Sequence, residues 1–323
     1  MEKSSRIYVA GHRGLVGSAI VRALNYQGYN NLLQRTHAEL DLTDRPAVQD
    51  FFDRERPEYV VLAAAKVGGI LANDTYPADF IRENLGIQTA VIDASHRAGV
   101  KRLLFLGSSC IYPKLAPQPI KEEYLLTGPL EPTNRAYALA KIAGVEMCWS
   151  YNRQYGTRYL AAMPTNLYGP GDNFDLKDSH VLPALMRKVV EAKRAGQKRL
   201  VVWGTGKPRR EFLYSDDLAE ACIHLMNLPD QEYETLISQE RAPLVNIGTG
   251  EDLTIRELAE LVSRVLDFDC ELVFDTSRQD GSPQKLLDVS RIHTLGWKAR
   301  ISLEEGIRRT YESARPQLEL ANS

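Results

Sequence analysis

A tyrosine and a lysine four residues apart, Tyr137 and Lys141, are the residues of this 323-residue sequence best suited to acid–base chemistry. Residues four apart on a helix share one face, so the Lys141 ammonium can approach the Tyr137 ring. A tyrosine hydroxyl has a pKa near ~10, and we expect the neighbouring cation to lower it towards the working pH. Ser108 and Cys110 end an apolar segment upstream, and glycines follow the first apolar segment. In this order, the three motifs predict a nicotinamide-dependent enzyme whose acid or base is a tyrosine.

The glycines Gly11, Gly14 and Gly17 stand between a predicted strand and a predicted helix. Glycine permits a tight turn and lets the backbone approach a pyrophosphate, which then binds at the helix N-terminus. Turn formation and packing alone could also require these glycines. The strand directly before them favours a dinucleotide site.

The residues after the second predicted strand bear on the choice of cofactor. An acid at that place would bind ribose hydroxyls and select NAD, but Arg35 and His37 stand there instead. Arg13 in the glycine turn adds a further cation, so the sequence favours a 2′-phosphate and hence NADP(H), with NAD as the alternative. Asp41 and Leu42 are placed to meet the adenine.

Short apolar segments alternate with helical patterns along the chain. Strands are predicted at 6–10, 32–35, 59–63, 102–107, 159–163, 199–203, 245–248 and 271–274. Helices are predicted at 15–27, 85–98, 135–155, 181–195, 216–226 and 255–266. This alternation predicts an α/β fold with a doubly wound, parallel Rossmann sheet. We expect a Rossmann domain at 1–165 plus about 214–245, and a smaller, partly interleaved α/β substrate domain at 166–213 and 246–323.

The composition narrows the functional class. A net charge of −2 gives no nucleic-acid signature, and the longest apolar run, 59–65, is too short to span a bilayer. The N-terminus lacks the apolar region of a signal peptide. The four cysteines have no C-x-x-C spacing, so we expect neither a metal site nor a disulfide scaffold, and a cytoplasmic location.

With these motifs in hand, the chain resembles the extended short-chain dehydrogenase/reductases. Within them it closely resembles the GDP-4-keto-6-deoxy-D-mannose 3,5-epimerase-4-reductases, whose product is GDP-L-fucose. The matching segments are 10–14, 63–70, 106–113, 164–170, 179–181 and 210–213. Ser-Ser-Cys-Ile-Tyr-Pro at 108–113 and Lys-Val-Gly-Gly-Ile at 66–70 are more particular to this branch than the glycine turn or Y-x-x-x-K. The resemblance implies NADP(H), a GDP-sugar substrate and a homodimer that pairs through helices at 84–97 and 135–155.

The resemblance also implies a cofactor site. Its residues are Gly11, His12, Arg13, Gly14, Leu15, Val16, Gly17, Arg35, His37, Asp41, Leu42, Leu106, Gly107, Lys141, Pro164, Asn166, Leu167 and His180. Asn166 and Leu167 follow a predicted strand, where a structural turn between Pro164 and Gly169 would also suit them. Bacterial members of the branch often have an arginine at the position of His37. An imidazole there weakens the grip on a 2′-phosphate and leaves it to Arg13 and Arg35.

The chemistry implied by the resemblance is epimerisation at carbons 3 and 5 followed by reduction of the carbon 4 ketone. Ser108 and Tyr137 would polarise the ketone, Tyr137 would supply the proton, and Lys141 would hold the cofactor ribose. Cys110 and His180 would be the base and the acid of the epimerisation. If the strand before it continues, Cys110 shares a face with Ser108. A cysteine in apolar surroundings is more often a small buried thiol, and a lone histidine near a helix start is more often structural.

The nucleotide half of the substrate requires cations, and six of them lie between 187 and 199. Such a run is usually a solvated helix face. The resemblance singles out five GDP-sugar contacts, namely Lys188, Trp203, Arg210, Asp280 and Lys285. Arginine binds phosphate through a two-pronged fork, and tryptophan offers a stacking face.

Three alternatives remain open. The first is a related epimerase-reductase on another GDP-keto-deoxysugar, of the colitose type. The second is a nucleotide-sugar 4-epimerase, which would retain NAD, or a dehydratase, which normally carries an acid pair where Ser109 and Cys110 stand. The third is a non-catalytic, cofactor-sensing regulator, which would typically lack Tyr137 or Lys141.

Overall fold

Six parallel strands form the main sheet of the computed structural model, which describes residues 1–176, 179–278 and 280–320. In spatial order they are β2 (Leu32–Leu33), β1 (Ile7–Ala10), β3 (Tyr59–Leu62), β4 (Arg102–Leu106), β5 (Tyr159–Pro164) and β9 (Leu244–Ile247). Strands β1, β4, β5 and β9 are buried along their whole length, because helices cover both faces of a parallel sheet. The predicted doubly wound Rossmann sheet is therefore confirmed.

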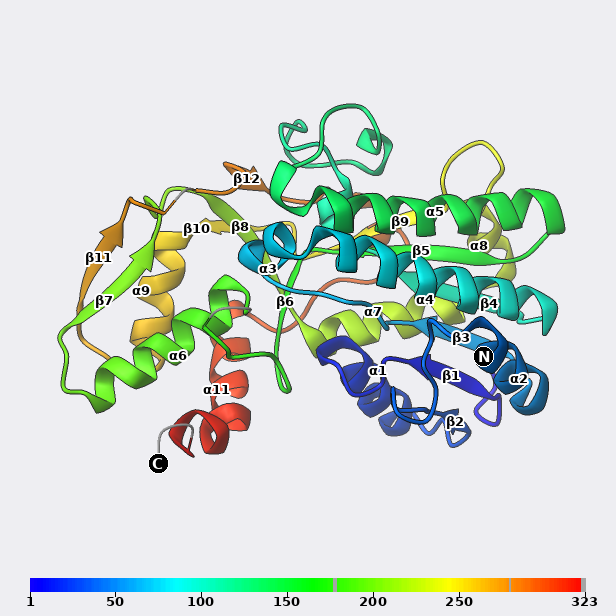
Figure 1. The fold of residues 1–323 in the computed structure, drawn as a ribbon, viewed down its shortest axis with the longest axis horizontal. Helices are drawn as coiled ribbons and strands as arrows, with labels where there is room; N and C mark the ends of the chain where they lie inside the picture. Colours follow the sequence, from blue (N-terminus) through cyan, green and yellow to red (C-terminus); the bar gives the residue numbers. More distant parts are fainter. Residues whose placement is uncertain (177–178, 279, 321–323) are drawn as a thin grey trace.

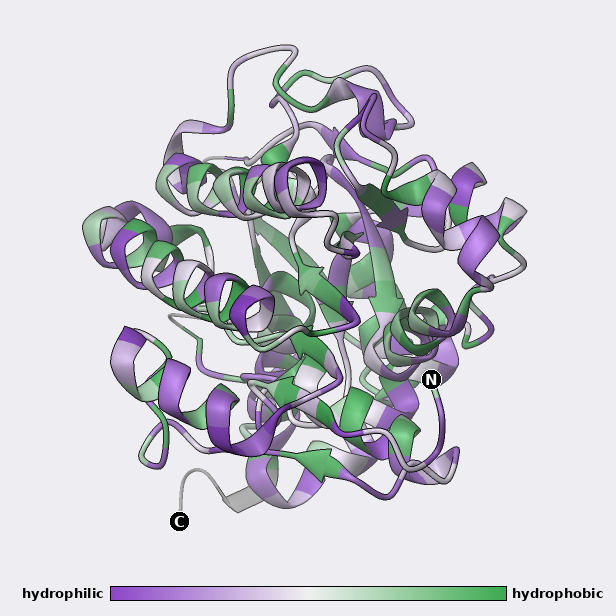
Figure 2. Ribbon diagram, turned by 90° about the vertical axis from the view of Figure 1, so that its right-hand side faces the viewer, coloured by the Kyte–Doolittle hydropathy of each residue, from purple (hydrophilic) through white to green (hydrophobic). Residues whose placement is uncertain are grey.

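Two groups of helices lie on opposite sides of this sheet (Figure 1). One group is α1 (Leu15–Tyr26) and α7 (Ser215–Asn227), and the other is α2 (Arg45–Glu55), α4 (Pro77–Arg97) and α5 (Arg135–Tyr155). Figure 2 shows the apolar strands enclosed between helices whose outer faces are hydrophilic. Helix α5 has its predicted bounds, but α4 begins eight residues before its predicted start at 85. Proline at its first position, where no N–H is needed, explains that start.

The second lobe is built from short strands and three longer helices. Strands β6 (Asn166–Tyr168), β8 (Arg209–Tyr214), β10 (Asp252–Thr254) and β12 (Gln284–Lys285) form one sheet, and β7 (Arg199–Trp203) pairs with β11 (Glu271–Asp275). Helices α6 (Val181–Arg194), α9 (Ile255–Val265) and α11 (Leu303–Leu320) contribute to its hydrophobic cluster. A capping box between Thr254 and Glu257 fixes the start of α9. The remaining helices are α3 (Ile70–Thr75), α8 (Asp230–Leu236) and α10 (Ser290–Thr294).

The two lobes interleave, and the division of the chain differs in detail from the expected boundaries. The boundary at 245 falls inside β9, which belongs to the Rossmann sheet. Leu287, Ile292 and Trp297 pack in the Rossmann cluster, although this stretch was predicted with the substrate domain. Packing of distant segments, rather than local pattern, decides where this return segment lies.

A buried carboxylate joins the lobes. Glu211 on β8 is fully buried, and one of its oxygens accepts the N–H groups of Thr249 at 2.6 Å and Gly250 at 2.8 Å. Its other oxygen accepts the Leu287 N–H at 3.0 Å. Burial raises the pKa of Glu211, which these hydrogen bonds partly offset. One side chain thus holds β8, the turn after β9 and the return segment together.

Within the described residues, no helix combines the length and hydropathy that crossing a membrane requires. No group of three or more His, Cys, Asp or Glu side chains in the same residues could hold a metal ion.

Candidate active site

The glycine turn after β1 is shaped by close contacts between main-chain atoms. Gly11 has a φ of +83°, and a Cβ there would lie 2.7 Å from Ala64 Cα. A Cβ on Gly17 would lie 2.1 Å from the Gly11 carbonyl oxygen. Gly14 is different, because a Cβ there would make only an ordinary 3.5 Å contact. The tight turn predicted from the three glycines is therefore required at Gly11 and Gly17.

The N-terminus of α1 is free to receive an anion. Gly14 is its N-cap, Leu15 and Val16 are its first residues, and its first turn has neither an acidic residue nor a side-chain cap. The first N–H groups of such a helix lack partners within the helix, which suits a phosphate. Beside the turn, Nδ1 of His12 is buried without a hydrogen-bond partner among the described residues. These features fit a dinucleotide pyrophosphate.

The cations expected to bind a 2′-phosphate are not equally available. Arg35 is held by Glu55, with Nη2 and Oε1 2.7 Å apart. The His37 side chain is 85% exposed, and its Nδ1 lies 3.9 Å from an Asp41 oxygen. Arg13 is exposed and forms no ion pair among the residues that the structure describes. Arg13 is therefore the freest of the predicted cations, and the pairing of Arg35 was not foreseen.

Glu39, an acid near the expected 2′-phosphate site, was not predicted from the sequence. Glu39 accepts hydrogen bonds from the backbone N–H and the hydroxyl of Thr36, at 2.7 and 2.8 Å. These bonds lower the pKa of Glu39, with Arg35 and Arg13 contributing further. The Thr-x-x-Glu spacing could have revealed this turn.

The remaining predicted cofactor residues stand at the carboxyl edge of the sheet, where ligands bind in such folds. Leu106 ends β4, and its carbonyl accepts a hydrogen bond from Lys141 Nζ at 2.7 Å. Gly107 follows directly, where a Cβ would lie 2.1 Å from Met163 Cε.

Pro164 ends β5, and Asn166 and Leu167 begin β6. The Asn166 amide donates to the Glu211 carbonyl at 2.8 Å, which gives it a structural role as well. Leu42, by contrast, is buried after β2.

Tyr137 and Ser108 are hydrogen-bonded to each other, as expected of a pair that binds one oxygen. The prediction that the pKa of Tyr137 is lowered is wrong for the free protein. Burial raises its pKa first, the Cys110 thiol adds to this, and only the Ser108 hydrogen bond opposes it. Tyr137 therefore keeps its proton at neutral pH, which suits a proton donor.

Lys141 explains why the expected effect is missing. Its ammonium bonds to the Leu106 carbonyl and lies 5.9 Å from the centre of the Tyr137 ring. Burial lowers the pKa of Lys141 to about 7, so the cation that should favour the phenolate is itself only partly charged near neutral pH.

Cys110 reaches the site by a route other than the expected strand. Strand β4 ends at Leu106, and residues Ser109–Ile111 form a 3₁₀ turn. The Ser108 hydroxyl caps this turn by accepting the Cys110 N–H at 3.2 Å. The Cys110 Sγ lies 3.3 Å from Asn134 Nδ2 and 3.7 Å from Lys285 Nζ. Asn134 was not among the predicted site residues.

His180 occupies the N-cap position of α6 and keeps access to solvent. Desolvation of the imidazole by the surrounding protein lowers the pKa of His180, and the Lys285 ammonium lowers it further. The same ammonium therefore acts on Cys110 by contact and on His180 through its charge. This places the two predicted acid–base residues in one neighbourhood.

The predicted nucleotide contacts fall into two groups. In the first, Lys188 Nζ lies 4.7 Å and Arg278 Cζ 4.9 Å from the Trp203 ring centre. Trp203 is 47% exposed, so this indole can stack a base or contact an apolar surface. Arg278 was missed because it lies in a loop without periodic pattern.

In the second group, strand pairing sets Arg210 on β8 beside Lys285 on β12. Arg210 Nη1 donates to the carbonyls of Ser282 and Arg209, both at 2.7 Å. Asp280 accepts the N–H of Thr205 at 3.0 Å and its hydroxyl at 2.6 Å, which fixes the turn after β7. Asp280 therefore has a structural role in this turn, and that role was not foreseen.

Comparison with known proteins gives a consistent family. Residues 7–242 match the family described as "NAD dependent epimerase/dehydratase family". A putative GDP-L-fucose synthase of Arabidopsis thaliana is 58% identical over 97% of this chain and 92% of the relative. The GDP-L-fucose synthase of Escherichia coli is 55% identical over 95% of each. A GDP-L-colitose synthase of Yersinia pseudotuberculosis is 35% identical over 94% of this chain and 96% of the relative.

Solved structures agree with this. A GDP-6-OMe-4-keto-L-xylo-heptose reductase from Campylobacter jejuni has a TM-score of 0.91 at 43% identity, covering 98% of this chain and 99% of that one. A GDP-mannoheptose C4 reductase from the same organism, with NADP bound, has a TM-score of 0.88 at 42% identity and the same coverage.

Proposed function

This chain belongs to the NAD dependent epimerase/dehydratase family and shares more than half of its residues with GDP-L-fucose synthases, and we propose that it makes GDP-L-fucose. The enzyme epimerises carbons 3 and 5 of GDP-4-keto-6-deoxy-D-mannose and then reduces the carbon 4 ketone with NADPH. The colitose-type alternative is less favoured, since the colitose synthase shares fewer residues with this chain.

The observation that carries the proposal is a hydrogen-bonded Ser108–Tyr137 pair with the Cys110 thiol beside it. Hydrogens next to a ketone are acidic only when the enolate oxygen is stabilised, and two donors on that oxygen supply this stabilisation. Cys110 removes the proton at carbon 3 or 5, and His180 returns one from the other side. The same two donors then hold the ketone oxygen for reduction.

Tyr137 completes the reduction because burial keeps it protonated. Bound NADPH would supply the hydride to carbon 4. Tyr137 gives its proton to the resulting alkoxide, and Lys141, next to the Leu106 carbonyl, holds the cofactor ribose. The glycine turn and the free N-terminus of α1 bind the pyrophosphate, and Arg13 takes the 2′-phosphate.

The test is NADPH oxidation with GDP-4-keto-6-deoxy-D-mannose in deuterated water, with the product analysed by mass spectrometry and NMR. We expect NADPH consumption and deuterium at carbons 3 and 5. Cys110→Ser should suppress the exchange, whereas Cys270→Ser, a matched change far along the chain, should leave it unaltered. NADPH consumption without deuterium at carbons 3 and 5 would mean that the enzyme is only a C4 ketoreductase. No NADPH consumption would refute the proposed substrate.

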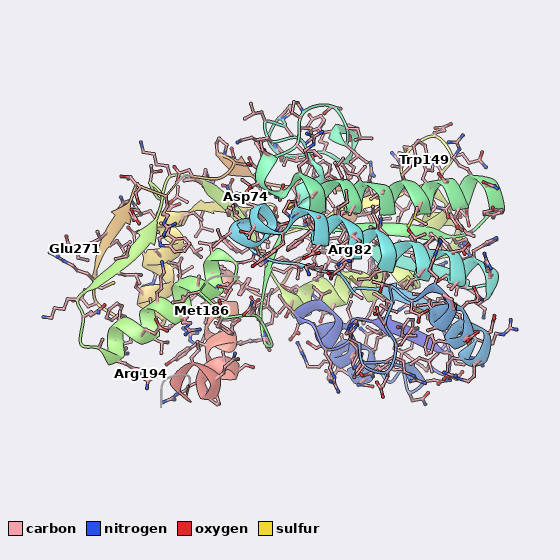
Figure 3. All side chains as sticks on the ribbon, viewed as in Figure 1. Asp74, Arg82, Trp149, Met186, Arg194 and Glu271 are labelled. Atoms are coloured by element: carbon pink, nitrogen blue, oxygen red, sulfur yellow. The ribbon has the colours of Figure 1, made fainter. Side chains whose placement is uncertain are left out.

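The proposal includes a homodimer and a cytoplasmic location. Helices α4 and α5 pack side by side over one face of the molecule, where Arg82 and Trp149 mark them in Figure 3. A second copy of the same two helices would complete a four-helix interface. Light scattering after gel filtration should give about twice the chain mass of 36.3 kDa, and a monomer at micromolar concentration would contradict it.

A further inference from the structure

The Lys285 side chain points at the thiol of the site rather than at an acidic partner. Its Nζ lies 3.7 Å from Cys110 Sγ. Across residues 1–176, 179–278 and 280–320, no carboxylate forms an ion pair with Lys285. An ammonium next to a sulfur favours the thiolate, which is the form that accepts a proton.

Asn134 supports the same sulfur. It stands at the N-cap of α5, where an asparagine ordinarily accepts a backbone N–H of the helix, yet it forms no such bond. Its Nδ2 donates instead to Cys110 Sγ at 3.3 Å, and its Oδ1 is buried without a partner among the described residues. The Asn134 side chain therefore donates a hydrogen bond to the Cys110 sulfur instead of capping the helix.

The backbone that carries Lys285 is held firmly in place. Lys285 on β12 is registered against Arg210 on β8. On one side, the Gln284 amide donates to Asp252 Oδ2 at 2.6 Å. On the other, the Leu286 N–H donates to Gln118 Oε1 at 2.9 Å. Fixed flanking residues position a side chain more accurately than a free loop does.

We propose that Lys285 is a positioning residue for Cys110, whose ammonium stabilises the thiolate that takes the sugar proton, rather than a ligand of the GDP phosphates. This rests on the proposed function. In the step, an S–H bond forms at Cys110 and a C–H bond of the sugar breaks. The electron pair of that bond moves to the ketone oxygen, which Ser108 and Tyr137 hold.

The first test needs no substrate, so its failure is separate from a failure of the proposed function. The rate of Cys110 alkylation by neutral iodoacetamide is measured at pH 7 by peptide mass spectrometry, with Cys270 as the internal reference. We expect Lys285→Met to slow alkylation of Cys110 about tenfold. Lys285→Arg, which keeps the charge, should stay within about threefold of the unmodified protein. Lys188→Met is the matched control in the same lobe and should have no effect.

A Lys285→Met protein that reacts as fast as the unmodified one overturns the proposal. Should that variant fail to fold, Lys285→Gln replaces it in the same comparison. A second measurement follows the rate of exchange of sugar hydrogens over a range of substrate concentrations up to saturation. A thiol-positioning lysine lowers the maximal exchange rate and leaves KM nearly unchanged, whereas a phosphate ligand raises KM and leaves that rate intact. The latter result would return Lys285 to the nucleotide site.

Discussion

The cofactor half and the substrate half of this molecule fix their functional residues in different ways. Around the glycine turn, main-chain atoms approach so closely that Gly17 has no room for a methyl group. In the second lobe, Lys188, Trp203 and Arg278 interact through partly exposed side chains. A steric requirement is satisfied or broken as a whole, whereas a partly solvated charge contributes gradually. Substitutions should therefore act abruptly in the first half and mildly in the second.

The largest effect is expected from Gly17→Ala. The new Cβ would lie 2.1 Å from the Gly11 carbonyl oxygen, so the turn must move. We expect the free energy of unfolding to fall by up to about 3 kcal/mol and NADPH binding to be lost. Thermal unfolding and calorimetric titration with NADPH measure both. Gly14→Ala is the control for stability and should leave the free energy of unfolding nearly unchanged. Normal NADPH affinity in Gly17→Ala would break the comparison.

A buried cation gives the next largest effect, as a dependence of stability on pH. Lys141 has a pKa of about 7 in the fold, against 10.5 as its ordinary value. Between these values the unfolded chain keeps the proton and the folded chain releases it, so stability rises with pH. From pH 7 to 9 we expect the free energy of unfolding of the cofactor-free protein to gain about 2 kcal/mol relative to Lys141→Met. Chemical denaturation at both pH values checks this, and equal slopes for the two proteins would contradict it.

Two arginines near the cofactor allow the comparison to be sharpened within one half. Arg13→Ala should weaken NADPH binding about tenfold while leaving NADH binding unchanged, because a charge-assisted bond to the 2′-phosphate is lost. Arg35→Ala should weaken it less than about threefold, since Glu55 already holds that guanidinium. Dissociation constants of both variants for NADPH and NADH test this ranking. The reverse ranking would show that Arg35 leaves Glu55 when the cofactor binds.

The smallest effect is expected at the outer nucleotide contacts. Lys188→Ala removes one of two cations beside Trp203, so KM for the GDP-sugar should rise only a few-fold, equivalent to ~1 kcal/mol or less. The maximal rate should not change. Lys198→Ala, an exposed lysine at the end of the same cationic run, serves as the control. A hundredfold rise in KM for Lys188→Ala would show that this half is as intolerant as the glycine turn.

Local patterns in the sequence predicted the sheet and the tight glycine turn well. The alternation of apolar segments led to the Rossmann fold, and helix α5 has its predicted bounds because its pattern runs unbroken from Arg135 to Tyr155. Helix α4 was predicted too short, since charged residues interrupt the apolar pattern in its first two turns and only Pro77 marks the start.

Contacts between residues far apart in the sequence could not be predicted from local patterns. Lys285 and Cys110 are 175 positions apart, so no local pattern shows that their side chains meet. The pKa of Tyr137 was predicted in the wrong direction because burial cannot be read from Y-x-x-x-K spacing. The ion pair between Arg35 and Glu55 was not foreseen because Glu55 lies in α2, a helix that was not predicted.

The carboxylate of Glu211 has a mechanical consequence. Because this side chain on β8 accepts hydrogen bonds from the turn after β9 and from the return segment at Leu287, the lobes cannot separate without breaking those bonds. The spacing between the cofactor edge and the sugar-binding strands is therefore a constant of the fold. The GDP-6-OMe-4-keto-L-xylo-heptose reductase from Campylobacter jejuni has a similar backbone, with a TM-score of 0.91. Diversification of this scaffold towards new sugars must then proceed by exchanging side chains, with the frame left as it is.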